Sequence, residues 1–280
     1  AMNEAQALSS VNYRILRTIS LNQQFYIIDI AYSDRNTVCL SVCADQKFYG
    51  STVNIERNPF SIVLPTGSYI NYVRSTIYYI NDNIVNACSC TSSYLRINGL
   101  TLLQNKADVN LFQTHGIVVC KSGYILVCQW NRKFKDQSAG KVVKLQYMDD
   151  SGSRIVMEIE SDKNQPLYIC PTYIAENGNG DICVSDVRAV VVTDAGGMLR
   201  FRYQGNSRDF DPYGICCDSS CNIIVADMKN DKIHVIDKDG TFLHHVTYDG
   251  IKMPRAICID ENNNLYVGEW HTDTVKVIAR

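Results

Sequence analysis

The chain has 280 residues, with 27 Lys and Arg against 29 Asp and Glu, a net charge of −2 and a pI of about 6.2. This length suits one large domain whose core needs no disulfide or metal to hold it. The charge balance argues against a broadly basic nucleic-acid surface, and no apolar run reaches the roughly 18 residues of a membrane helix. No signal-peptide pattern is present and Ala1-Met2 resembles a cloning remnant, so we expect residues 1–12 to be disordered or vector-derived.

Twelve cysteines are spread through the chain, mostly within apolar runs such as TVCLSVC and GYILVCQW. None forms a CxxC pair, and the closest spacings, such as Cys88-x-Cys90 and Cys217-xxx-Cys221, match zinc-ligand spacing poorly. We therefore expect reduced cysteines that pack as small hydrophobic residues, without a metal or other cofactor. Reduced cysteines predict a reducing compartment, the cytoplasm.

The predicted elements are short strands bounded by Gly, Asn, Asp and Pro. A single strand at Tyr13–Ser20 comes first. The first unit is predicted to hold strands at Ile27–Tyr32, Val38–Val42, Thr52–Glu56 and Ser61–Leu64. The second unit is predicted at Thr76–Ile80, Ile84–Cys88, Tyr94–Ile97 and Leu100–Leu103. The third is predicted at Gly116–Cys120, Tyr124–Cys128, Lys141–Tyr147 and Arg154–Ile159, with an enlarged loop before its third strand.

The last three units repeat one another. They begin at Pro171, Pro212 and Pro254, which are 41 and 42 residues apart. Each continues with an apolar strand that ends in an acidic residue, namely Asp186, Asp227 and Glu269. Strand units at a period of about 40–45 residues are typical of β-propellers. The acidic residues recur at one blade position, which indicates a structural role such as hydrogen bonding to a loop backbone.

The two ends of the chain complement each other. The last unit ends after its third strand, and the predicted strand at Tyr13–Ser20 precedes the first unit and belongs to none of the six. A fourth strand from the N-terminus would complete the last blade and remove its open edge. We predict an all-β, six-bladed propeller with four antiparallel strands per blade, in one domain at residues 13–280.

The repeat also resembles a known family. PYGICCD, IIVAD and KIHVI at residues 212–236 are similar to the NHL repeat, and residues 254–278 repeat the pattern. Such propellers stand at the C-terminus of tripartite-motif RING ubiquitin ligases. The resemblance implies a parent with RING, B-box and an oligomerising coiled coil, and a propeller that selects a protein substrate or adaptor. Single-stranded RNA binding is the alternative that the family implies.

The candidate ligand face collects the loops into the first strands and out of the second strands. It carries aromatic and basic residues, which suit protein hot spots or base stacking. The candidate residues are Trp130, Arg132, Lys133, Phe134, Tyr173, Arg188, Arg208, Tyr213, Lys229, Arg255, Trp270 and His271. Trp130 and Trp270 share one repeat position, so packing between blades is the alternative role for both.

We expect that this chain is not itself an enzyme, because it has too few histidines near the propeller axis. Similar propellers include an amidating lyase that holds zinc with histidines near the axis. Of the five histidines only His115 and His271 fall on the candidate face, which is too few for a three-histidine site. No paired carboxylates or nucleophile motif replaces them.

Overall fold

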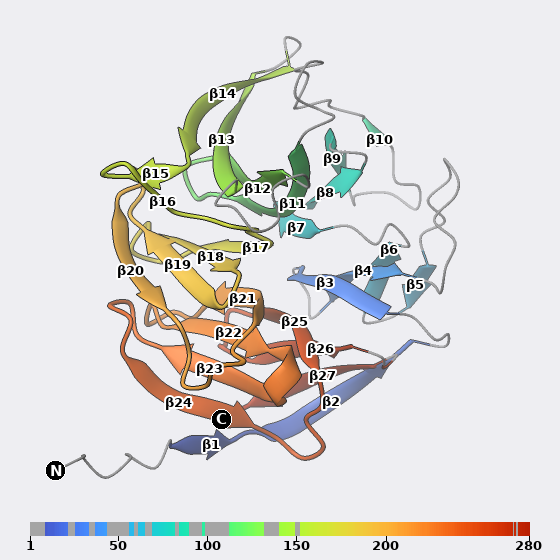
Figure 1. The fold of residues 1–280 in the computed structure, drawn as a ribbon. Helices are drawn as coiled ribbons and strands as arrows, with labels where there is room; N and C mark the ends of the chain where they lie inside the picture. The colour runs from blue at the N-terminus through green and yellow to red at the C-terminus, as the bar shows by residue number, and fades with distance from the viewer. Residues whose placement is uncertain are drawn as a thin grey trace, which may run out of the picture.

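A computed structural model describes residues 9–21, 26–33, 37–43, 56–58, 61–64, 69–81, 84–89, 97–98, 112–131, 140–148, 152–270, 272 and 274–280. The described residues form β-strands without an α-helix; the one helical turn is the 3₁₀ segment η2 (Met228–Asn230). No helix that could cross a membrane occurs among them. The strands form six sheets of four or five strands, arranged around a common centre (Figure 1), and one small hairpin, β15 (Ser161–Asp162) with β16 (Gln165–Pro166).

Each sheet has an inner strand near the centre and an outer strand at the periphery. The inner strands are β3 (Tyr26–Tyr32), β7 (Ile70–Val73), β11 (Phe112–Val119), β17 (Tyr173–Glu176), β21 (Pro212–Cys217) and β25 (Pro254–Ile259). The second strands are β4 (Val38–Cys43), β8 (Thr76–Asn81), β12 (Ile125–Asn131), β18 (Ile182–Asp186), β22 (Ile223–Asp227) and β26 (Leu265–Glu269). Each inner strand contacts the next, and β25 contacts β3.

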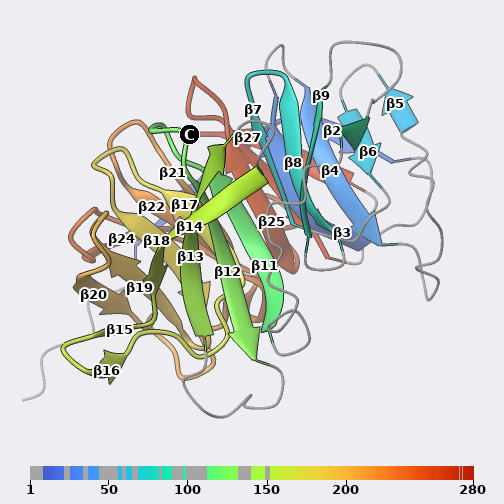
Figure 2. The same cartoon turned by 90° about the horizontal axis from the view of Figure 1, so that it is seen from above.

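The third and outer strands follow the same scheme. The third strands are β6 (Ser61–Leu64), β9 (Ile84–Ser89), β13 (Gly140–Met148), β19 (Ala189–Thr193), β23 (Lys232–Ile236) and β27 (Thr274–Ala279). The outer strands are β5 (Glu56–Asn58), β10 (Ile97–Asn98), β14 (Gly152–Ile159), β20 (Leu199–Tyr203), β24 (Phe242–Thr247) and β2 (Arg14–Ser20). Figure 2 shows neighbouring sheets, such as β11–β14 and β17–β20, packed face to face.

The core lies between the faces of adjacent sheets. Strands β18, β19, β22 and β26 are buried along their whole length. A strand that is covered on both faces needs apolar residues at successive positions, which explains the unbroken IIVA run of β22. Cys39, Cys128 and Cys183 are fully buried in this packing as free thiols, as expected from the sequence.

The N-terminal strand joins the last sheet, as predicted. Strand β2 pairs antiparallel with β27, with Ile15 opposite Ile278. The expectation of a disordered end is wrong for residues 10–12, which form β1 (Ser10–Asn12) and pair in parallel with β24. Because β24 is an outer strand, its free backbone groups are available to this additional strand.

The second sheet differs from the prediction by one strand. Its inner strand is β7, which was not predicted. The predicted inner strand, Thr76–Ile80, belongs to β8 and is the second strand of the sheet. Each later strand of the sheet likewise lies one place further from the centre than predicted. A two-residue turn at Arg74 and Ser75 joins β7 to β8, with φ of 47° and 63°. Such turns usually use Asn or Gly, so the sequence carries no turn signal here. The predicted strand at 100–103 lies outside the described residues.

The first sheet has a different strand order from the one expected. Strand β6 takes the third place, parallel to β4, and β5 is outermost. The sequence supplies the reason: SIVL in β6 suits an interior place, whereas ERN in β5 suits an exposed edge. Of the predicted strand Thr52–Glu56, residues 52–55 lie outside the described residues.

Candidate functional site

The recurrent acidic residues hold the loops that lead into the inner strands. The Asp186 carboxylate accepts hydrogen bonds from the backbone N–H groups of Ile169 and Cys170, at 2.7 and 2.6 Å. Glu269 accepts hydrogen bonds from the Tyr248 hydroxyl at 2.6 Å and from the Lys252 N–H at 3.3 Å. The structural role expected for this repeat position is therefore confirmed, and these loops are fixed at one end of the sheets.

Arg255 lies at this end, near the start of β25. Its Nε donates a hydrogen bond to the Tyr173 hydroxyl at 3.2 Å, and that hydroxyl donates to the Ile28 carbonyl at 2.5 Å. The guanidinium carbon lies 4.2 Å from the Trp270 ring centroid and 5.2 Å from that of Tyr213. The Arg255 guanidinium thus lies over two aromatic rings, an arrangement that stabilises a cation without a carboxylate.

Asp29 is the buried carboxyl near this guanidinium. Its two oxygens accept the backbone N–H groups of Ile30 and Ile70, both at 2.9 Å. Burial raises the pKa of Asp29 to about 7, against these hydrogen bonds and the positive charge of Arg255, which lower it. Asp29 and Arg255 interact through their charges but form no ion pair among the described residues.

Aromatic rings extend from Arg255 across the centre. Tyr69 packs edge-on against Tyr173 at 4.9 Å and against His115 at 5.4 Å between centroids. His115 in turn stacks on Trp130 at 5.5 Å. Burial raises the pKa of Tyr173 to about 12, so this hydroxyl stays protonated. These contacts form a continuous series of aromatic rings from Tyr173 to Trp130.

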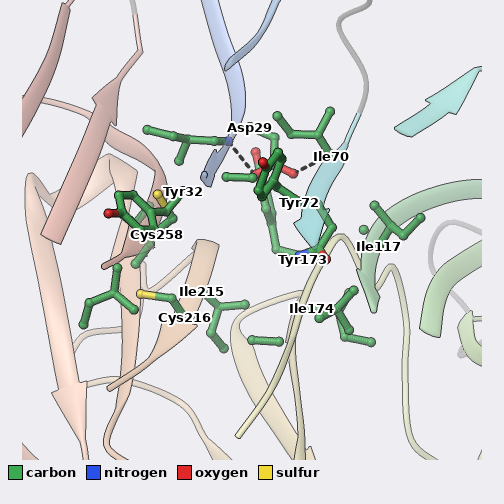
Figure 3. Close-up of a pocket in the computed structure, with 18 of the residues that line it drawn as sticks. Asp29, Tyr32, Ile70, Tyr72, Ile117, Tyr173, Ile174, Ile215, Cys216 and Cys258 are labelled. Atoms are coloured by element: carbon green, nitrogen blue, oxygen red, sulfur yellow. Dashed lines mark hydrogen bonds between the residues drawn. The ribbon is translucent and has the colours of Figure 1, made fainter. Parts of the chain in front are cut away.

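A cavity of about 250 Å³ lies among the inner strands, and Figure 3 shows side chains from several of them around it. Asp29 and Tyr173 belong both to its lining and to the surroundings of Arg255. Cys216 and Cys258 line it as well, where small side chains fit near the centre. Burial raises the pKa of both thiols, which makes them poor nucleophiles.

The structure separates the candidate residues into groups. Tyr173 is 4% exposed, and its hydroxyl accepts a hydrogen bond from Arg255. Tyr213, Trp130 and Trp270 are half-buried and present part of their rings. Trp270 also packs on Tyr26 at 4.8 Å, so it has a packing role as well.

The charged candidates differ in their partners. Lys229 forms an ion pair with Asp211 at 2.7 Å. Arg188 and Arg208 are exposed. Arg132, Lys133, Phe134 and His271 lie outside the described residues, as does most of the enlarged loop.

Two central residues were missed from the sequence. Asp29 interrupts the apolar run YIIDIAY, and a carboxyl in a strand that is otherwise apolar was the signal that would have identified it. Tyr69 was missed because β7 itself was not recognised.

A second polar cluster lies between β22, β23 and β24, away from Arg255. The His234 ring bonds to the Tyr203 hydroxyl at 2.8 Å and to the Asp227 carboxylate at 3.3 Å. His245 packs edge-on against His234 at 4.5 Å between centroids. Among the described residues, no group of three or more His, Cys, Asp or Glu is arranged to hold a metal ion.

No family model matches the chain, and no curated protein is significantly similar to it in sequence. Solved structures do share its fold. Virginiamycin B lyase from Staphylococcus aureus, crystallised with quinupristin, is 14% identical with a TM-score of 0.58, over 91% of this chain and 81% of the lyase. The WD40 propeller domain of Doa1 is 12% identical with a TM-score of 0.59, over 96% and 97%. A chain of the nidogen–laminin complex is 15% identical with a TM-score of 0.53, over 82% and 83%.

These similarities define the class: the chain is an all-β protein with a propeller fold. They also correct one expectation. The exclusion of an enzyme on the ground of too few central histidines is wrong, since lyases are among the proteins with this fold. The number of histidines on one face does not decide whether a propeller is catalytic.

Proposed function

We propose that this protein is a recognition domain that binds a protein partner through the face around Arg255. The observation that carries the proposal is the grouping of Arg255, Tyr213 and Trp270, in which a guanidinium lies over two partly exposed aromatic rings. Arg, Tyr and Trp are the residues most enriched among interface hot spots. The loops that present them are fixed by buried carboxylates, so little ordering is needed on binding.

The same proposal extends to the architecture and the parent. The six sheets and the β2–β27 pair support a six-bladed ring of the NHL type, closed by the N-terminal strand. The NHL-like repeat supports a parent of the tripartite-motif ubiquitin-ligase class, in which this domain selects the substrate or adaptor. Single-stranded RNA is the second candidate ligand, supported by exposed Arg188 and Arg208 on the loops at the same end.

A library of random dodecapeptides tests the first proposal on the purified chain. We expect selected peptides to lose most of their affinity with Tyr213→Ala or Trp270→Ala. They should keep it with Tyr124→Ala, which removes a half-buried ring beside the turn at the opposite end of β12. Melting curves confirm that each variant is folded. Absence of peptide binding, with salt-sensitive binding of a random RNA pool that Arg132→Glu/Lys133→Glu abolishes, would favour RNA instead.

A further inference from the structure

Arg255 has no acidic partner among the described residues, in contrast to Lys229 and Arg200, which form ion pairs. Lys229 is neutralised by Asp211, and Arg200 by Asp181 and Asp239. Among the described residues, no carboxylate lies within ion-pair distance of Arg255, although its side chain is half-buried. The rings and the Tyr173 hydroxyl stabilise this cation, but its charge is not neutralised by a neighbouring carboxylate, so the site can accept an anionic group from outside.

The unused part of the guanidinium is its terminal edge. Nε donates to the Tyr173 hydroxyl, and the guanidinium carbon lies over the rings of Trp270 and Tyr213. The Arg255 side chain is half-buried, and its two Nη groups are not among the fully buried polar atoms without a partner in the described structure. Two parallel N–H donors on a rigid planar group match the two oxygens of a carboxylate.

Within the described residues Asp29 forms no ion pair with Arg255, and its two oxygens accept the backbone N–H groups of Ile30 and Ile70. A nucleic acid would need several free cations along its backbone. On this face Lys229 is already paired, which leaves Arg188 and Arg208 as the exposed cations among the described candidates, and the chain as a whole carries a net charge of −2. A single anchored guanidinium over two rings fits one carboxylate next to apolar groups better than a phosphate chain.

We infer that Arg255 is a carboxylate receptor, and that the ligand of this face is a peptide whose carboxylate forms a bidentate ion pair with the Arg255 guanidinium while its neighbouring apolar groups pack on Tyr213 and Trp270. This inference rests on the proposed protein-binding function and specifies its ligand. The carboxylate comes from an Asp or Glu side chain or from the C-terminus of the partner.

The test uses the random dodecapeptide library in two forms, with amidated and with free C-termini. Enrichment of Asp or Glu at one position in the amidated form identifies a side-chain carboxylate, and binding only by the free form identifies a C-terminal one. Each selected peptide is then compared with its Gln, Asn or amide counterpart. We expect neutralising the carboxylate to weaken binding to the wild-type chain by about tenfold or more.

Arg255→Met should remove this preference, leaving less than about twofold between the paired peptides, whereas Arg255→Lys should keep part of it. Arg154→Met, on outer strand β14, is the matched control and should keep the full preference. Equal binding of the paired peptides by the wild-type chain overturns the inference without the need for any variant. If binding still depends on Tyr213 and Trp270 in that case, the proposed function stands; if no peptide binds at all, both fail.

Discussion

Replacing Asp29 with asparagine should change how the stability of the protein depends on pH. The folded protein raises the pKa of this carboxyl from 3.8 to about 7, chiefly through burial. The folded state therefore holds the proton more tightly than the unfolded state does. Protonation stabilises the fold, and this contribution is lost as the pH rises from about 4 through 7. The Asp29→Asn variant lacks the titrating proton, so it should not show this loss.

The magnitude follows from the two pKa values. Over the interval from pH 5 to pH 8 the linkage relation gives a loss of about 2.5 kcal/mol for the wild type relative to Asp29→Asn. Asp29 is 8% exposed, so solvent screening reduces this figure little. The other titrating groups are present in both proteins, and their effects cancel in the difference.

Urea unfolding at pH 5, 6, 7 and 8 measures this difference directly. We expect the free energy of unfolding of the wild type to fall relative to that of Asp29→Asn across the series. Asp249→Asn, in an exposed turn, is the control and should run parallel to the wild type. Parallel curves for Asp29→Asn, or a wild type that gains stability with rising pH relative to it, would refute the reasoning: the carboxylate would then be stabilised by Arg255 rather than penalised by burial.

Three further predictions concern the framework of the sheets. Burial and the neighbouring His234 lower the pKa of His245 to about 4. The folded state therefore favours the neutral ring, and this contribution to stability is present above pH 6.5 and is lost as the pH falls. In urea unfolding, His245→Gln should therefore reduce the loss of stability at acid pH. Gly214→Ala should cost about 1–3 kcal/mol in the same assay, because an added Cβ would lie 2.5 Å from the Arg255 carbonyl oxygen. Asp260→Ala should cost about 2–3 kcal/mol, since this carboxylate accepts two bonds from Asn264 and one from the N–H of residue 262; a melting temperature equal to that of the wild type would contradict it.

The later sheets were largely readable from the sequence, because each blade needs the same local chemistry. Asp218 and Asp260 each accept backbone N–H groups two and four residues further on, as is typical of Asp in tight turns. Gly197 and Gly240 adopt φ of 87° and 94° in Asp-x-x-Gly turns. These turns depend only on residues that are close together in the chain, so they can be predicted from a single sequence.

The sequence by itself determined the all-β class, the repeat and the pairing of the N-terminal strand with the last sheet. Short apolar runs, turn residues and the number of strands in each unit can all be read along the chain without knowledge of distant contacts. Only the tertiary structure decided that the β7–β8 turn is formed by Arg74 and Ser75, and that Arg255 meets Tyr173 and Trp270. Tyr173 and Arg255 are 82 residues apart in the chain. Their contact exists because inner strands of different sheets converge at one centre, and no property of either residue's own neighbours specifies which distant side chain it will face there.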